Sequence, residues 1–274
     1  MALQNKNNRT TNNHLELSIQ ISLSGLSFCV LNRSKNKITH LQDILFDKKQ
    51  TPLKLNSLLN QELEENNILK TTYSKVCVIH DNDLSSLVPK QLFSETHLAD
   101  YLKFNTKILK SDFITSDEIS ENNSINVYVP YINVNNFIYD TFGTFTYKHV
   151  SSILIKNILL LEKETKTTKF YVNVSQDHFE IIIVENKKLL LYNSFNYNTK
   201  EDFIYYILFT AEQLKLNPET LNLVFIGSIL KNDDLYNITY KYIRTINFGN
   251  RFDTYKYKNK PTNNYSNFTL IKSL

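Results

Sequence analysis

The same order of predicted elements occurs twice in this sequence, from about residue 15 and again from about residue 170. Each copy starts with three strands joined by short polar turns, which is typical of an antiparallel meander. A helix, a short apolar strand and a second helix then follow. This repeated order predicts a duplicated α/β architecture, with chance recurrence in a chain of mixed helices and strands as the alternative.

The first copy begins at residues 15–23, where apolar and polar side chains alternate as in a half-buried strand. Thr51 and Pro52 then provide an N-cap and a favourable first residue for a helix. The run 75–80 is continuous and apolar, as expected for a parallel strand covered on both faces. The other elements of this copy are predicted as strands at 26–31 and 38–46 and helices at 52–70 and 94–104.

The second copy begins near residue 170 and ends in a helix near residue 242. Thr199 caps its first helix, and acidic residues in the first turn interact favourably with the helix dipole. Its strands are predicted at 170–175, 179–184, 189–195 and 221–227, and its second helix at 232–242. Between the copies we expect weaker strands near 109–114 and 125–130, and helices at 133–142 and 151–164 joined by a strand at 144–149.

A chain of 274 residues is long enough for two domains of ordinary size. Its 42% hydrophobic and 21% charged residues indicate a soluble globular protein. The sequence has neither an apolar run that could span a membrane nor a secretion signal, so we expect a cytoplasmic protein without membrane insertion. Cys29 and Cys77 lie in apolar runs and are expected to be reduced core thiols. The predicted organisation is a disordered leader at 1–13, a first lobe at 14–150, a second lobe at 151–254 and a basic aromatic tail at 255–274.

The net charge of +4 is spread along the chain and arginines are few, which argues against nucleic acid as a partner. Residues 255–260 interleave aromatic and basic side chains, a composition that can stack bases or contact anionic lipid. A charged, partly disordered end is the simpler interpretation of this segment. The aromatic helix face of Phe203, Tyr205, Tyr206 and Phe209 fits either core packing or a protein interface.

The segments 15–28, 191–197 and 201–206 together resemble an uncharacterised bacterial domain-of-unknown-function family. The duplicated meander also resembles the superfamily of actin, sugar kinases and heat-shock chaperones, and in particular the pilus-assembly and cell-division actin-like proteins. The resemblance covers about residues 14–252. It implies a two-lobed actin-like (ribonuclease H-like) α/β fold, in which each lobe has a mixed sheet with a three-stranded antiparallel meander flanked by helices.

The resemblance also implies where a nucleotide would bind. In the superfamily the first hairpin turn of each meander wraps a phosphate, using glycines, a hydroxyl and a carboxylate that holds the water shell of magnesium. The two carboxylate positions fall on Ser22 and Asn173, so neither brings a negative charge. The other implied nucleotide-binding positions are Ser24, Gly25, Ser27, Ser175, Gln176, Asp177, Gly227 and Ser228.

Phosphoryl transfer depends on a metal ion to neutralise developing charge, and the implied magnesium carboxylates are missing. We therefore predict no catalytic residues, no bound metal and no enzymatic activity, with ATP as the one candidate cofactor. The expected function is a non-catalytic scaffold or protein-binding module that binds a protein partner or itself. The alternative is a weak ATP-binding conformational switch that uses the cleft between the lobes.

Two short segments combine histidine with carboxylates. Residues 80–83 (His-Asp-Asn-Asp) follow a predicted parallel strand, at the sheet edge where α/β folds bind ligands, although a solvated turn is the simpler interpretation. Residues 177–180 (Asp-His-Phe-Glu) lie on a predicted hairpin, but neither a cysteine nor a second histidine lies near them at metal-ligand spacing. We therefore expect no metal site in either segment.

Overall fold

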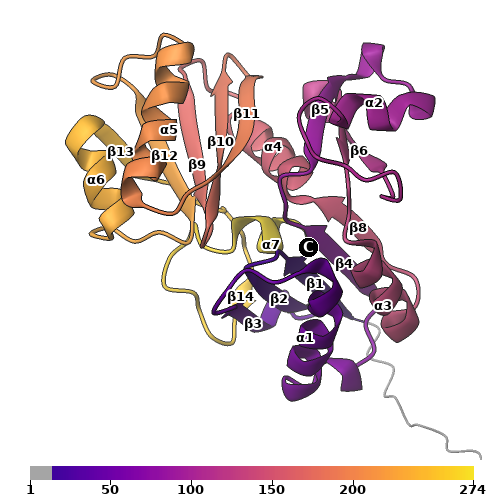
Figure 1. Ribbon diagram of the computed structural model, residues 1–274. Coiled ribbons are helices and arrows are strands. Elements are labelled where there is room, and N and C mark those ends of the chain that lie inside the picture. The colour runs from indigo at the N-terminus through magenta and orange to yellow at the C-terminus, as the bar shows by residue number, and fades with distance from the viewer. Residues whose placement is uncertain (1–13) are drawn as a thin grey trace, which may run out of the picture.

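The computed structural model describes residues 14–274, so the predicted leader at 1–13 lies outside the described residues. Two sheets form two lobes, and a third, smaller sheet lies beside them (Figure 1). The sheet of the first lobe contains β1 (Leu15–Ile21), β2 (Gly25–Asn32), β3 (Lys37–Leu45), β4 (Lys75–His80), β8 (Thr146–His149) and β14 (Lys256–Tyr257). The sheet of the second lobe contains β9 (Lys169–Val174), β10 (His178–Glu185), β11 (Lys188–Asn196), β12 (Asn222–Gly227) and β13 (Thr245–Phe248).

Apart from the additional edge strand β14 in the first lobe, the two lobes have the same strand order and the same strand directions. The first sheet runs β14-β3-β2-β1-β4-β8 and the second runs β11-β10-β9-β12-β13. In the first, β1 pairs antiparallel with β2 and parallel with β4. In the second, β9 pairs antiparallel with β10 and parallel with β12. The predicted duplication of a three-stranded meander is therefore confirmed.

The helices follow the same order in both lobes. In the first lobe α1 (Pro52–Glu65) precedes β4, and α3 (Ile132–Phe142) precedes β8; in the second lobe α5 (Lys200–Gln213) precedes β12, and α6 (Asp234–Tyr242) precedes β13. Each lobe then continues into one more helix, α4 (Val150–Leu161) after β8 and α7 (Phe268–Lys272) near the C-terminus. Thr199 caps α5 as predicted, since its side chain accepts a hydrogen bond from the Asp202 backbone N–H.

Helix α4 connects the parts of the molecule. Most of its side chains are buried, and it packs against β10 and β11 of the second lobe, β6 of the third sheet and α7 (Figure 1). A helix that is hydrophobic on nearly all sides needs cover on nearly all sides. The position of α4 between these elements provides that cover.

The segment between β4 and α3 differs from the prediction. A helix was expected at 94–104, but the chain forms a separate antiparallel sheet in the order β5-β7-β6 and only the short helix α2 (Leu98–Leu102). The strands are β5 (Ser85–Pro89), β6 (Thr115–Ile119) and β7 (Ser124–Tyr128). Three short 3-10 helices also lie in this segment, Lys90–Leu92, Glu95–His97 and Ser120–Asn122, and a fourth, Ile68–Lys70, follows α1. The predicted strand at 109–114 is also wrong, because β6 begins after it. Local pattern could not reveal this sheet, since its small core of residues such as Val88, Leu102 and Val127 is assembled from separate short runs.

The C-terminal segment is folded, and the expectation of a partly disordered end is wrong. β14 extends the first sheet by pairing in parallel with β3, although the preceding strands belong to the second lobe. Phe268, Leu270 and Ile271 of α7 are buried between the lobes. The buried guanidinium of Arg251 donates to the carbonyl oxygens of Asn263 and Ser266 and so fixes the intervening loop. The basic and aromatic composition of the tail concealed this apolar stripe.

Cys29 and Cys77 are both buried and free, as predicted. In the described part of the chain, residues 14–274, none of the helices has the length and apolar character needed to cross a bilayer.

We predict that α7 is required for the stability of the whole fold. Phe268 is 1% exposed, so Phe268→Ala leaves a cavity and should lower the free energy of unfolding by about 3–5 kcal/mol. Phe252, in the loop before β14, is 70% exposed, and Phe252→Ala should change the free energy of unfolding by less than about 0.5 kcal/mol. Denaturant unfolding of both variants measures the difference, and equal losses would contradict the role of α7.

Candidate functional site

The predicted nucleotide-site residues meet between the lobes. All except Asp177 line one cavity: Ser22, Ser24, Gly25, Ser27, Asn173, Ser175, Gln176, Gly227 and Ser228. Asp177 lines an adjoining cavity. The duplicated topology explains this convergence, because it brings the β1–β2 turn, the β9–β10 turn and the end of β12 to one place.

The cavity is small. Its volume is about 90 Å³, whereas pockets for ligands of cofactor size are typically about 300–1,000 Å³. Part of its wall is formed by Phe268, Thr269 and Leu270 of α7. A whole nucleotide would therefore not fit in this cavity alone.

The backbone donors of the first hairpin turn are bonded within the turn. The Ser22 N–H donates to the Gly25 carbonyl oxygen over 3.0 Å. The Ser22 hydroxyl oxygen accepts from the Ser24 N–H at 3.2 Å and from the Gly25 N–H at 3.0 Å. Ser22 thus stabilises the turn in place of a bound phosphate.

Three backbone donors of the second half of the site are also bonded within the protein. The Ser175 N–H donates to the His178 carbonyl oxygen at 3.0 Å, and the Ser228 N–H to the Val174 carbonyl oxygen at 2.7 Å. The Gly227 N–H donates to the Tyr265 carbonyl oxygen at 3.0 Å, which ties the end of β12 to the loop before α7. These N–H groups would have to break their present bonds to bind an anion.

The two glycines of the predicted site are required by the packing of the chain. A Cβ at Gly25 would lie 2.8 Å from the Ile44 carbonyl oxygen. At Gly227, where φ is +85°, a Cβ would lie 2.4 Å from the Val174 carbonyl oxygen. Close backbone approach explains both residues without a ligand.

The C-terminal segment forms polar contacts with the first lobe across this cavity. Thr269 donates a hydrogen bond from its hydroxyl to the side-chain oxygen of Gln20 on β1. The Asn267 side chain donates to Asp43 Oδ1 at 2.6 Å. The cavity wall is therefore held by both apolar packing and side-chain hydrogen bonds.

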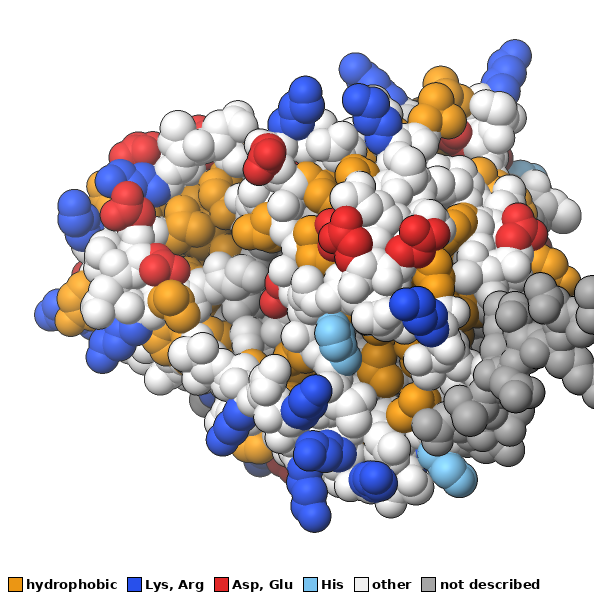
Figure 2. Space-filling model, turned by 90° about the horizontal axis from the view of Figure 1, so that it is seen from below, with side chains coloured by type: hydrophobic (Ala, Val, Ile, Leu, Met, Phe, Trp, Pro, Cys, Tyr) orange, Lys and Arg blue, Asp and Glu red, His pale blue; other side chains and the backbone are white. Residues whose placement is uncertain are grey.

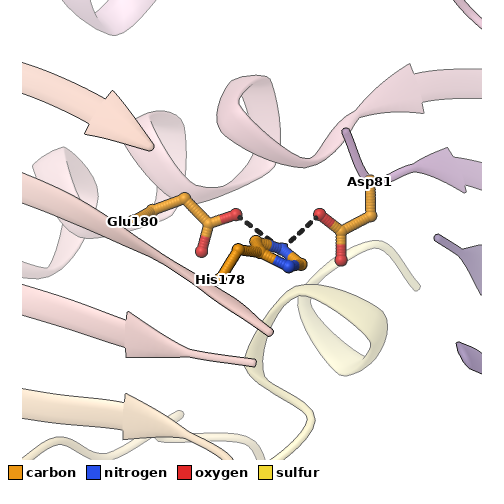
Figure 3. A group of neighbouring side chains, drawn as sticks. All are labelled: Asp81, His178 and Glu180. Carbon is orange, nitrogen blue, oxygen red and sulfur yellow. Dashed lines mark hydrogen bonds and ion pairs between the residues drawn. The ribbon is translucent and has the colours of Figure 1, made fainter. Parts of the chain in front are cut away.

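A buried cluster of Asp81, His178 and Glu180 lies next to this cavity (Figure 3). His178 Nε2 is 3.0 Å from Asp81 Oδ1 and 3.6 Å from Glu180 Oε1. His178 Nδ1 is 2.9 Å from Asp177 Oδ1, and that oxygen also accepts from the Ser24 hydroxyl at 2.9 Å. Asp81 follows β4 in the first lobe and the other two lie on β10 in the second, so the cluster joins the lobes.

Burial and mutual charge shift the pKa values of the cluster in different directions. Burial alone would lower the pKa of His178, but the carboxylates of Asp81 and Asp177 raise it well above the ordinary value. Burial would raise the pKa of Asp81, yet the charge of His178 and its hydrogen bond lower it. Burial raises the pKa of Glu180 to about 7, with a further contribution from the charge of Asp81. One histidine thus faces more carboxylate charge than it can neutralise.

Sequence reasoning missed this cluster. His178 and Glu180 lie two residues apart on one strand and so face the same side. Their third partner, Asp81, is 97 residues before His178 in the chain. The solvated-turn interpretation of residues 80–83 is wrong for Asp81 and for His80, which are both buried. His80 instead bonds to the Asn135 side chain, and burial lowers its pKa to about 3.

Comparison with known proteins gives a family and a fold. The family described as a protein of unknown function (DUF3822) matches residues 4–246. A crystal structure of a Bacteroides thetaiotaomicron protein with an actin-like ATPase fold and unknown function is similar with a TM-score of 0.78 and 23% identity, over 88% of this chain and 93% of that one. The PilM-PilN type IV pilus biogenesis complex is similar with a TM-score of 0.56 and 9% identity, over 89% and 90% of the two chains. No curated protein matches the sequence.

These findings confirm the predicted resemblance and the actin-like fold class. At these identities the structural likeness concerns the fold alone. The ten residues of the predicted nucleotide site are near one another, while their role stays a prediction.

We predict that Gly227 is required for folding whether or not a nucleotide binds. In Gly227→Ala the positive φ strains the backbone by about 1–2 kcal/mol, and the added Cβ also clashes with the Val174 carbonyl oxygen. This variant should therefore lower the free energy of unfolding by about 3 kcal/mol or more. Gly143 is the matched control, with φ of +81° and no atom within 4 Å of an added Cβ. Gly143→Ala, at φ +81° and ψ −138°, should cost only the backbone strain of about 1–3 kcal/mol in the same denaturant titration, and less than Gly227→Ala. A Gly227→Ala variant as stable as Gly143→Ala would show that packing does not require this glycine.

Proposed function

The chain belongs to the DUF3822 family, and from its actin-like fold and its cleft we propose that it is a non-catalytic protein-binding module. The observation that carries this proposal is the presence of α7 in the wall of the cavity between the lobes. In this arrangement the protein's own C-terminal segment closes part of the cavity that the resemblance assigns to a nucleotide.

The charges of the cleft support the same function. Ser22 and Asn173 stand at the two positions where the resemblance implies magnesium carboxylates. The Asn173 side chain is buried and donates to Glu180 Oε2 at 2.9 Å, so it serves the protein itself.

An exposed aromatic group on α5 supports a protein partner. Tyr205 is 59% and Phe209 43% exposed, and their rings stack with centroids 5.9 Å apart. Phe203 of the same helix is buried in the core, whereas Tyr205 and Phe209 are not. Core packing therefore explains only part of the predicted aromatic face. Exposed Tyr and Phe side chains are favoured at protein interfaces. The structurally similar PilM is itself found in a complex with PilN, which is consistent with this kind of role.

Nucleic acid is not part of this proposal. On the face seen in Figure 2, Lys and Arg side chains are spread around the rim, and Asp and Glu side chains lie among them. A nucleic-acid site would gather basic side chains in one continuous strip.

The two free, buried cysteines support a reducing compartment such as the cytoplasm.

We predict that ATP with magnesium leaves the melting temperature unchanged. A ligand bound only to the folded state at a hundredfold excess over its Kd adds about 2.7 kcal/mol, which would raise the melting temperature of a chain of this size by roughly 5–10 °C. The measurement is a thermal-shift titration with ATP in the presence and absence of magnesium, with inorganic phosphate plus magnesium as the control. A saturable shift specific to ATP would instead favour the ATP-binding switch, and magnesium-dependent phosphate release would overturn the proposal.

We predict that the aromatic group on α5 contributes to partner binding. The double variant Tyr205→Ala and Phe209→Ala should lose a cross-linked partner, or self-association, that the unmodified protein shows in its own cells. Tyr139→Ala is the control, because Tyr139 is 63% exposed on α3 in the other lobe. A strictly monomeric protein that cross-links to nothing would contradict the protein-binding role.

A further inference from the structure

Three buried side chains from both lobes direct potential metal-ligand atoms toward one point (Figure 3). The distance from His178 Nε2 is 3.0 Å to Asp81 Oδ1 and 3.6 Å to Glu180 Oε1. All three side chains offer ligand atoms within 4.8 Å of one another. Ligand atoms at about 2.0–2.2 Å from a tetrahedral zinc ion lie about 3.4 Å apart. We propose that Asp81, His178 and Glu180 bind a single Zn²⁺ ion between the lobes.

Each of the three side chains is oriented by a partner on its other polar atom. Asp177 Oδ1 lies 2.9 Å from His178 Nδ1, in the arrangement of a carboxylate, a histidine and a metal. Gln20 Nε2 donates to Asp81 Oδ2 at 2.9 Å, and Asn173 Nδ2 donates to Glu180 Oε2 at 2.9 Å. These outer contacts leave Nε2 and one oxygen of each carboxylate directed toward the common point.

The charge of the cluster also favours a divalent cation. Asp81 and Glu180 are 5% and 1% exposed, and the single positive charge of one imidazole can compensate only one of two buried carboxylates. A Zn²⁺ ion would neutralise both carboxylates and leave the imidazole neutral, which is the form that binds metal.

The ligand set favours a transition metal such as zinc over magnesium or calcium. One imidazole and two carboxylates suit zinc, whereas magnesium and calcium prefer oxygen ligands throughout. An adjoining cavity of about 50 Å³ is lined by Asp81, His178 and Ser22. It has room for a water molecule as the fourth ligand.

The ion would hold the lobes together, because Asp81 follows β4 and the other two ligands lie on β10. This inference is independent of the proposed partner-binding function. Neither the ATP experiment nor the cross-linking experiment bears on it, and its failure leaves both untouched.

We predict that the full-length chain, stripped with a chelator and dialysed, binds one equivalent of Zn²⁺ in a calorimetric titration. Asp81→Asn and Glu180→Gln, which retain the shape of the side chains, should each weaken binding at least tenfold. Asp177→Asn retains all three ligands and should weaken binding by about 10–100-fold through loss of the outer contact. Asp83→Asn is the matched control, since Asp83 is exposed and lies two residues from Asp81, and it should bind as the unmodified chain does.

The visible absorption of Co²⁺ gives a second readout that needs no variant. Co²⁺ in a four-coordinate site of nitrogen and oxygen ligands absorbs much more strongly than hydrated Co²⁺, and one equivalent of Zn²⁺ should abolish the signal. Circular dichroism confirms that each variant is folded before its affinity is compared. Absence of stoichiometric binding, or equal affinity in Asp81→Asn, Glu180→Gln and the unmodified chain, would overturn the site.

Discussion

The C-terminal helix α7 lies between the two lobes, and the arrangement of the cleft depends on it. Its apolar side chains complete the core between the sheets, and β14 ahead of it extends the sheet of the first lobe. The segment thus returns to the first lobe after the second lobe is complete. Because Tyr265 accepts a hydrogen bond from the Gly227 N–H, the same segment also fixes the end of β12 at the cavity.

This packing explains why residues that resemble a phosphate-binding site serve the protein itself. A phosphate loop must present unpaired N–H groups to its ligand. Here most of the corresponding N–H groups are already bonded, to Ser22, to neighbouring carbonyl oxygens and to the loop before α7; these are the N–H groups of Ser22, Ser24, Gly25, Ser175, Gly227 and Ser228. The glycines are retained because another backbone segment approaches each of them too closely for a Cβ.

Polar contacts across the lobes reinforce this closed arrangement. The Ser24 hydroxyl in the first hairpin turn donates to Asp177 in the second, and Asp177 in turn contacts His178. His178 then meets Asp81 from the opposite lobe. Buried charges of this kind are stable only with compensating partners, so the relative position of the lobes and the state of the cluster depend on each other.

The sequence by itself determined the duplicated meander and the α3–β8–α4 connection, because strand alternation, helix caps and polar turns are local signals. The convergence of the predicted site residues was implied only by the resemblance to the actin-like superfamily. It did not determine the third sheet, because the short strands of that sheet are covered only by one another. It also did not determine the position of the tail, because the few apolar residues of the tail become part of the core only when both lobes surround them. The Asp81 and His178 contact likewise exists only in the folded chain, because neither residue carries a local signal of a partner 97 positions away. Tertiary structure decided these features, since burial and charge pairing depend on which distant segments come together.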